Sequence, residues 1–457
     1  MTVTDEAALL RKYNVQGPRY TSYPAVPFWE TAPTAAQWLE HVSSAIDADT
    51  AHSGASVYVH VPFCRSLCTY CGCNMRVTRS SAPVMPYVHS VLREYALYLR
   101  GLGRDSLRIG ELHLGGGTPT FLDPAELDAL IGGLLDKATL APGASLSIEV
   151  DPRVTTREQL QVLARHGFDR ISLGVQDFDP RVQEIVNRVQ SEAQVHEVTE
   201  TARELGFRSV NYDLIYGLPM QTLGSINDTM DAVARLRPDR IAFYAYAHVP
   251  WIKPSQRRFT EADLPDGEAR LQLLALGRER LAAAGYVEIG MDHFALPGDL
   301  LNQAARNGLL HRNFMGYTQS FTTPLVGLGV SSIGDAGDAY MQNEKNLQQY
   351  EARIAQDELP IVRGHLFDEE DRVLRRHILN LMTRFETRWD PGSTHARYLE
   401  QVPARLHELQ QDGLVHVNGT HVAVTAIGRS YLRNVCMAFD ARLMRRAPAT
   451  QLFSQTV

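Results

Sequence analysis

The sequence predicts an α/β fold in which six strand–helix units form a parallel sheet, closed or nearly closed into a barrel. Apolar runs of strand length alternate with helix-length runs of helical period between residues 56 and about 294. Polar residues gather where the strands end, which is where such folds place their chemistry. Four of the five cysteines lie in ten residues soon after the first strand-like run.

Each element is predicted from its own run of residues. The strands are expected at Ser56–Val61, Glu111–Leu114, Leu146–Val150, Arg170–Val175, Ser209–Tyr216 and Arg240–Tyr246. The helices are expected at Val84–Leu102, Pro124–Leu135, Arg157–His166, Ser191–Leu205, Ser225–Leu236 and Glu268–Ala284. The polar groups that follow the strands include the cysteine loop, Gly115–Pro119, Glu149–Pro152, Gln176-Asp177, Asp213 and Tyr246–His248. Their convergence predicts one active site at the carboxyl ends of the strands.

Residues 1–55 are predicted to form an N-terminal arm. A short helical run precedes the segment 17–24, where Gly17, Pro18 and Pro24 disfavour regular structure. Composition alone favours a solvated arm, although Arg19 and the two tyrosines would also suit an arm that folds over a pocket.

Two further segments complete the chain. Residues 295–365 are expected to connect and complete the catalytic domain, with a glycine-rich strand or loop at 327–334. In residues 366–457, helical runs precede a hairpin marked by Asn418-Gly419. This order predicts a mostly helical, winged-helix-like domain that acts as a lid or packing module, since no basic face supports DNA binding.

Composition excludes several classes of protein. The 457 residues are 44% hydrophobic and 21% charged with a net charge of −7, which is typical of a soluble globular protein. There is no overall basic footprint for nucleic acid or an anionic membrane. No apolar run reaches the length of a membrane span, and the first residues lack a signal-peptide pattern. We therefore expect a cytoplasmic protein with reduced thiols, no nucleic-acid or membrane partner, and a monomeric state.

The cysteine loop carries the chemistry. Cys64, Cys68 and Cys71 have the spacing C-x3-C-x2-C, which can place three sulfurs on one cubane iron–sulfur cluster. Four cysteines usually hold such a cluster, so three would leave one iron open to a small molecule. A zinc site usually draws on two separated ligand pairs, and a disulfide needs an oxidising compartment. Cys73 is left open as a fourth ligand or a thiol of the substrate pocket.

For several other candidate groups, the sequence leaves a functional and a structural interpretation open. The glycines at 115–117 can either let a ligand approach the backbone or simply make a turn. Glu149, Asp213 and Arg188 can bind a ligand or form internal ion pairs. His60 is predicted to be a hydrogen-bonded strand residue, and Cys436 a buried apolar one.

With Tyr70 before its third cysteine, the loop resembles that of radical S-adenosylmethionine enzymes. Further motifs resemble one family in that class, the oxygen-independent coproporphyrinogen III oxidases. They lie at Pro18–Pro24, Cys64–Asn74, Gly115–Thr120, Glu149–Arg153, Gly174–Phe178, Asp213–Pro219, Met291–Phe294 and His311–Phe314. The resemblance extends to about Phe453 and implies an incomplete (β/α)6 TIM-like barrel of the radical S-adenosylmethionine type, with the N-terminal arm covering the active site.

The resemblance also implies cofactors and site residues. Cys64, Cys68 and Cys71 would hold a 4Fe-4S cluster whose free iron binds S-adenosylmethionine, while Cys73 would not be a ligand. Two S-adenosylmethionine molecules are expected. The first would contact Tyr58, Gly116, Glu149 and Ile333, and the second Tyr70, Gly117, Thr118, Gln176, Arg188, Asp213 and Ala247. Tyr58 and Cys73 are the predicted catalytic residues.

The implied reaction converts two propionates of coproporphyrinogen III to vinyl groups through a 5′-deoxyadenosyl radical. It yields protoporphyrinogen IX in anaerobic haem biosynthesis and needs a low-potential electron donor such as flavodoxin or ferredoxin. Arg19 and Arg312 are candidates to bind propionates. The nearest alternative is a haem chaperone of the same superfamily, which usually lacks the fourth cysteine, the arm and the longer C-terminal region. A haem-degrading radical methyltransferase relative and a zinc-stabilised interaction protein are weaker alternatives.

Overall fold

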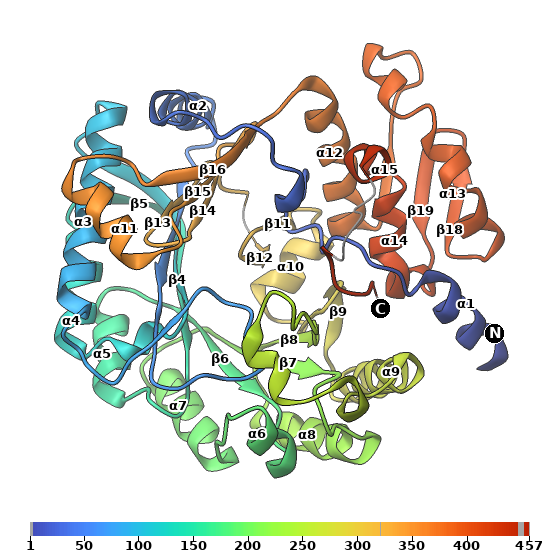
Figure 1. Cartoon of the computed structure of the whole chain (residues 1–457), viewed down its shortest axis with the longest axis horizontal. Helices are drawn as coiled ribbons and strands as arrows, with labels where there is room; N and C mark the ends of the chain where they lie inside the picture. The colour runs from blue at the N-terminus through green and yellow to red at the C-terminus, as the bar shows by residue number, and fades with distance from the viewer. Residues whose placement is uncertain (1–2, 320, 447–451, 457) are drawn as a thin grey trace.

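The computed structural model describes residues 3–319, 321–446 and 452–456. Six parallel strands lie side by side in chain order and carry the catalytic half of the molecule (Figure 1). They are β1 (Ala55–Val61), β4 (Leu107–Gly116), β5 (Ala138–Val150), β6 (Arg170–Gln176), β7 (Ser209–Tyr216) and β8 (Arg240–Ala245). All six were predicted, although β4 and β5 begin earlier than expected.

The sheet continues beyond both ends of this parallel set. On one side β13 (Leu325–Leu328) pairs parallel with β1 and is followed by three antiparallel strands. Those strands are β14 (Ile333–Asp335), β15 (Ala339–Asn343) and β16 (Ile361–Leu366), while β10 (His293–Ala295) and β9 (Val287–Gly290) extend the other side. Within the described residues β9 and β16 do not pair with each other, so the barrel is open. This confirms the expectation of an incomplete barrel.

Helices cover the outer face of the parallel strands (Figure 1). They are α3 (Val84–Leu102), α4 (Pro124–Leu135), α5 (Arg157–Arg165), α7 (Glu192–Glu204), α8 (Leu223–Leu236) and α9 (Gly267–Ala283), each within two residues of its prediction. Local sequence sets where they begin, because Asp123, Thr156 and Ser191 each cap a helix by accepting a hydrogen bond from the third amide.

Shorter elements fill the connections. The helices among them are α6 (Pro180–Ile185), α10 (Leu300–Arg306) and α11 (Leu347–Ala355). Two small strand pairs are β2 (Phe63–Cys64) with β3 (Arg76–Val77), and β11 (His311–Asn313) with β12 (Gly316–Thr318). Single 3-10 turns lie at η1 (Val26–Phe28), η2 (Pro119–Phe121), η3 (Pro254–Arg258), η4 (Glu261–Asp263), η5 (Thr394–Tyr398) and η6 (Gly428–Tyr431).

The N-terminal region is packed rather than solvated. It contains α1 (Val3–Tyr13) and a second helix, α2 (Ala35–Asp47), whose Trp38 is fully buried and donates to the hydroxyl of Tyr98 on α3 at 2.9 Å. Tyr20 and Tyr23 in the segment between them are also buried. A solvated arm is therefore wrong for this region, and 35–47 belong to the packed barrel. Met1 and Thr2 lie outside the described residues.

The C-terminal region forms a module with its own core. It contains α12 (Glu369–Arg384), β17 (Glu386–Arg388), α13 (Val402–Gln411), β18 (Val415–Asn418), β19 (His421–Val424), α14 (Leu432–Met437) and α15 (Ala441–Arg445). The three strands form one antiparallel sheet in the order β17-β19-β18, and α1 packs into the same core. This arrangement fits the winged-helix-like prediction, and Cys436 is fully buried as expected. The predicted domain 366–457 includes residues 447–451 and 457, which lie outside the described residues.

The predicted hairpin forms, but its turn is shifted by one residue. Asn418 pairs with His421, so Gly419 and Thr420 make the two-residue loop. Gly419 has φ +58°, which suits a glycine at the first turn position of a tight hairpin. No helix among the described residues is both long and apolar enough to cross a membrane.

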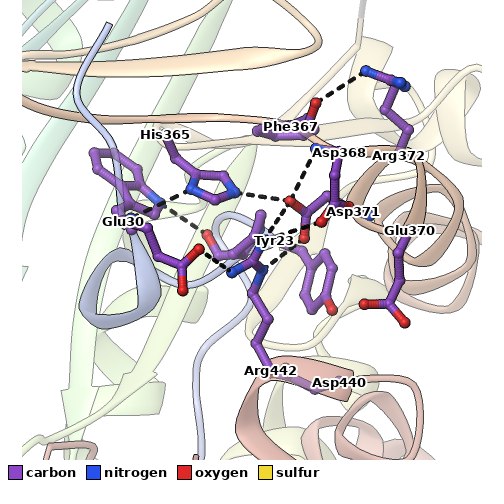
Figure 2. A network of polar contacts seen from close by, with 12 residues as sticks. Tyr23, Glu30, His365, Phe367, Asp368, Glu370, Asp371, Arg372, Asp440 and Arg442 are labelled. Atoms are coloured by element: carbon purple, nitrogen blue, oxygen red, sulfur yellow. Dashed lines mark hydrogen bonds and ion pairs between the residues drawn. The ribbon is translucent and has the colours of Figure 1, made fainter. Parts of the chain in front are cut away.

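A buried polar network fastens the N-terminal region to the C-terminal module (Figure 2). Arg442 on α15 donates to both oxygens of Asp371 at 2.7 and 2.8 Å and lies 3.1 Å from Glu30. His365 on β16 contacts the same Asp371 carboxylate at 2.8 Å. Segments around residues 30, 365–371 and 442 thus meet in one network, in which the Asp371 carboxylate is fully buried and Glu30 joins through Arg442 and His365.

We expect Asp371→Asn to lower the free energy of unfolding by about 3 kcal/mol, because it removes the buried carboxylate that accepts two hydrogen bonds from Arg442 and leaves only the more exposed Glu30 and Asp368 as its ionic partners. Burial raises the pKa of Asp371, but His365 and Arg442 outweigh it and hold the pKa below its usual range. The contribution of ionised Asp371 to the free energy of unfolding is therefore present above about pH 4 and is lost as the pH falls below that value. Anaerobic urea unfolding of the wild type and the variant at pH 7 and pH 3 measures this contribution. The control is Glu408→Gln, an exposed partner of Lys12; an equal effect of both variants would contradict the prediction.

Candidate functional site

A cavity of about 490 Å³ runs inside the barrel, from the first residues of β6, β7 and β8 to the loops at the carboxyl ends of the parallel strands. Twelve of the fifteen predicted site residues line it: Cys64, Cys68, Tyr70, Cys71, Cys73, Gly116, Gly117, Thr118, Glu149, Gln176, Arg188 and Asp213. They come from five different strands or the loops after them, as expected for a parallel sheet whose strand ends share one edge.

The remaining three predicted residues are not among those that line this cavity. Tyr58 donates or accepts a hydrogen bond with His60 at 3.1 Å and stacks on His113, which does line it. The carbonyl of Ala247 accepts from Gln256 at 3.2 Å, and Ile333 begins strand β14. The cofactor contacts predicted for Tyr58, Ala247 and Ile333 stay predictions.

The cysteine loop is anchored to the segment that follows α6. The amide of Thr69 donates to the carbonyl of Val186 at 3.0 Å, and its hydroxyl donates to Ile185 at 3.2 Å. The side-chain amide of Asn187 donates to the carbonyl of Leu67 at 2.7 Å. The loop on both sides of the second cysteine, Cys68, is therefore fixed by residues more than one hundred positions further along the chain.

Arg188 forms the internal ion pair that sequence analysis left open. Its Nη1 lies 3.3 Å from Asp151 and 3.6 Å from the sulfur of Cys68, while Nη2 donates to the carbonyl of Gly174 at 2.6 Å. Arg153 contacts the same Asp151 at 2.6 Å and the same sulfur at 3.8 Å. Two guanidinium groups beside Cys68 suit a sulfur that carries negative charge as a metal ligand. The contact predicted between Arg188 and a second cofactor stays a prediction.

The other thiols have contrasting environments. Burial raises the pKa of Cys64 to about 11, although Thr118 lies 3.4 Å from its sulfur. A hydrogen bond with Cys73 lowers the pKa of Cys71 to about 6, and the same bond raises the pKa of Cys73. The amide of Cys73 also donates to the Cys71 sulfur at 3.4 Å. Cys73 thus belongs to the loop's polar network, and the structure does not decide its role as a ligand.

The three cysteines fit an iron–sulfur cluster. Their side chains line one cavity, with two guanidinium groups and no carboxylate in contact with the Cys68 sulfur among the described residues. In the same part of the chain, no three cysteine, histidine or acidic side chains converge as ligands of one ion. A cluster does not require the sulfurs to converge on one ion, because each sulfur binds a different iron.

The glycine run has a packing reason. A Cβ on Gly117 would lie 2.8 Å from the carbonyl of Pro62, and one on Gly116 would lie 2.5 Å from the ring of His60. Gly116 also has φ +110°, which favours glycine. His60 is held by a contact of 2.8 Å to the carbonyl of Asn74, which agrees with the prediction of a hydrogen-bonded strand residue.

Two carboxyl groups on the cavity wall differ in protonation. Glu149 accepts from the amide of Gly116 at 3.0 Å and lies 3.5 Å from His113; burial opposes ionisation, but these contacts lower its pKa. Asp213 accepts from Ser172 and Asn211 at 2.9 Å, yet burial and the charge of Glu149 raise its pKa to about 7. The cavity therefore presents one ionised carboxylate and one that titrates near neutral pH.

Sequence analysis missed part of the cavity wall. Arg170, Arg240, Tyr244, His293 and Tyr317 also line it. Arg170 and Arg240 open strands β6 and β8, so their position at the start of an apolar run was the available signal. His293 lies in the family motif Met291–Phe294, although no role was predicted for it, and Tyr317 lies in the short strand β12, for which no strand was predicted.

Comparison with known proteins agrees with this geometry. A model of the Radical SAM superfamily matches residues 58–233. The chain is 40% identical to the oxygen-independent coproporphyrinogen III oxidase of Pseudomonas aeruginosa over 97% of both chains. It is 41% identical to the Escherichia coli protein of that name over 99% of this chain and 98% of that one. The solved coproporphyrinogen III oxidase of Escherichia coli has a TM-score of 0.88 at 39% identity, covering 95% of this chain and 98% of that one.

The open barrel with a three-cysteine loop at its carboxyl edge defines a radical S-adenosylmethionine protein. Because its relatives match over nearly their full length, the chain belongs to the family of oxygen-independent coproporphyrinogen III oxidases.

We expect Asp213→Asn to stabilise the cluster-free protein increasingly as the pH rises from 4 to 7, by about 2 kcal/mol above pH 7. Because the folded-state pKa of Asp213 lies above its unfolded value, the wild type loses stability across this window and the variant does not. Thermal unfolding at pH 5, 6, 7 and 8 measures the difference. A difference that stays constant over these pH values would contradict the raised pKa.

Proposed function

We propose that this protein oxidatively decarboxylates two propionate side chains of coproporphyrinogen III to vinyl groups, giving protoporphyrinogen IX. The observation that carries this proposal is the near full-length match to oxidases of that name, combined with the three cysteines that line one cavity. Each conversion removes a hydrogen atom, one electron and carbon dioxide from a propionate.

Cys64, Cys68 and Cys71 would hold the 4Fe-4S cluster, and S-adenosylmethionine would bind beside it. When bound, these groups supply the one-electron chemistry that starts the reaction. Arg188 and Arg153, both in contact with Cys68, fix the loop and balance the charge of its sulfur. The protein's own task is thus to position the cofactors and substrate and to exclude competing reactions.

The carboxyl groups suit a cationic cofactor. S-adenosylmethionine carries a sulfonium and an ammonium group, and Glu149 offers an ionised carboxylate held in place by Gly116 and His113. Asp213 offers a second carboxyl group on the same cavity. Two such groups support the proposal that two S-adenosylmethionine molecules bind, with Tyr70, Gly117, Thr118, Gln176 and Arg188 beside the second. Tyr58 and Cys73 are kept as proposed catalytic residues.

Partners and location follow from the same reaction. A low-potential donor such as flavodoxin or ferredoxin would supply the electron, and the reduced thiols that the cluster needs suit a cytoplasmic protein. A monomer is proposed. The haem-chaperone alternative is less favoured, because the chain has Cys73, the N-terminal segment around Arg19 and the C-terminal module.

An anaerobic assay tests the function. Reconstituted holoprotein, S-adenosylmethionine, a low-potential reductant and coproporphyrinogen III are combined, and porphyrins and 5′-deoxyadenosine are quantified together. Protoporphyrinogen formed alongside 5′-deoxyadenosine is the expected result. A protein that contains the cluster and binds haem, but does not decarboxylate, would support the chaperone instead.

Alanine variants test the cluster ligands. Cys64→Ala, Cys68→Ala and Cys71→Ala should each lose the cluster's visible absorption and all activity, because three cysteines are the minimum set. Cys73→Ala is the matched control in the same loop and should keep its iron. Iron and sulfide analysis after anaerobic purification measures this, and loss of iron from Cys73→Ala would refute its assignment as a non-ligand.

A further inference from the structure

Four arginines without a carboxylate partner lie near one another behind the cavity wall, and none of them lines the cavity itself. They are Arg19, Arg270, Arg312 and Arg433, and in the part of the chain that the structure describes none of them forms an ion pair with an acidic side chain. The hydrogen bonds that they form go to backbone carbonyls such as Ala245. We call these four residues the arginine cluster. Unpaired buried charge is costly, so a cluster of this kind in a protein of net charge −7 needs an explanation.

The members of the cluster differ in how many of their guanidinium N–H groups form hydrogen bonds. Arg433 donates to the carbonyls of Pro18, Gln455 and Gly17, so it fixes the N-terminal segment. Arg19 donates to Ala245, the last residue of β8, at 2.6 Å. Arg312 is only 4% exposed, yet its Nε and Nη1 have no hydrogen-bond partner among the described residues. Arg312 is therefore the least satisfied buried charge of the cluster.

Arg312 lies against the cavity wall. It pairs across the β11–β12 hairpin with Tyr317, and its guanidinium carbon is 4.5 Å from the centre of that ring. Tyr317 lines the cavity, as does His293, which contacts Asp292 at 3.3 Å. Burial opposes ionisation of Asp292, but His293, Arg312 and Arg19 lower its pKa to about 2. Arg312 and Arg19 thus act on one carboxylate, which is too little negative charge for the whole cluster.

We propose that Arg312, together with Arg19, binds a carboxylate of the substrate and so sets its orientation in the cavity. A guanidinium with two free N–H groups matches a carboxylate in geometry and charge, and it forms strong hydrogen bonds with it. The inference rests on the proposed function for the identity of the ligand, a tetrapyrrole with four propionates. The general ligand class, a carboxylate, rests on the arginine cluster.

The bound carboxylate is one that does not react in that step. Loss of carbon dioxide removes the negative charge of a carboxylate, and a guanidinium that stabilises this charge in the ground state would raise the barrier. The arginine cluster therefore holds a propionate that stays intact, and this contact presents another propionate to the cofactor. Arg312 is a positioning residue on this view.

Binding and turnover together test the proposal. Anaerobic holoprotein is titrated with coproporphyrin III, which has four propionates, and with mesoporphyrin IX, which has two, and tryptophan fluorescence quenching gives Kd. KM and kcat for coproporphyrinogen III are measured in parallel, with release of the three-propionate intermediate. The variants are Arg312→Gln, Arg312→Lys and Arg19→Gln. Arg278→Gln, which removes an arginine paired with Glu288 and Ser430 near the same module, is the matched control.

We expect Arg312→Gln to raise Kd for coproporphyrin III and KM by about 10- to 100-fold, the effect of one charge-assisted hydrogen-bond pair. Arg312→Lys should recover part of this loss, and the three-propionate intermediate should escape from Arg312→Gln before its second decarboxylation. Arg278→Gln should change neither Kd nor the intermediate. Since Arg19 is half-buried, Arg19→Gln repeats the test at a position that the fold tolerates.

Results that differ from these expectations distinguish failure of the carboxylate site from failure of the proposed function. Wild-type turnover with Kd and KM unchanged in both Arg312→Gln and Arg19→Gln would overturn the carboxylate site and leave the proposed function intact. An equal loss in Arg278→Gln would reduce Arg312 to a structural role. Porphyrin binding that depends on Arg312, in a protein that never decarboxylates, would support the carboxylate site and overturn the proposed function.

Discussion

The site depends on the buried ion pair between Arg188 and Asp151. Asp151 follows β5 and Arg188 follows α6, and Arg188 also reaches the carbonyl of Gly174 in β6 and the sulfur of Cys68. One guanidinium therefore joins two strand ends to the cysteine loop. A buried charge of this kind is tolerated only when its partners are all in place, so the geometry of the loop and that of the sheet edge are specified together.

The open side of the barrel imposes a second constraint. Because β9 and β16 do not pair among the described residues, the barrel has an open side, and the N-terminal segment and the C-terminal module lie toward that side (Figure 1). The carboxylate of Asp371, shared by His365 and Arg442, fastens the β16 edge to this module (Figure 2). The edge of the catalytic sheet is thus stabilised by its packing against the two chain ends.

Local patterns made the sheet and most of the cavity predictable. Apolar runs of strand length and runs of helical period predicted β1, β4 to β8 and the helices that follow them, and polar residues at strand ends identified Glu149 and Asp213. Long-range partners were not predictable: the burial of Tyr20 depends on Asp440, 420 residues away, and the role of Arg188 depends on Asp151. The helix at 35–47 was not predicted, although the Thr34–Gln37 capping box marks its start in the sequence.

Charge gives the cavity a direction. Glu149 and Asp213 lie on its wall with the cysteine loop, whereas Arg312 and Arg19 carry unpaired positive charge behind Tyr317 and at the end of β8. A cationic cofactor would therefore be drawn to Glu149 and Asp213, and a carboxylate of the substrate to Arg312 and Arg19. Only the part of the substrate away from the arginines could then approach the cofactor. In this way two sets of fixed charges, neither of which takes part in bond breaking, would select the propionate that reacts.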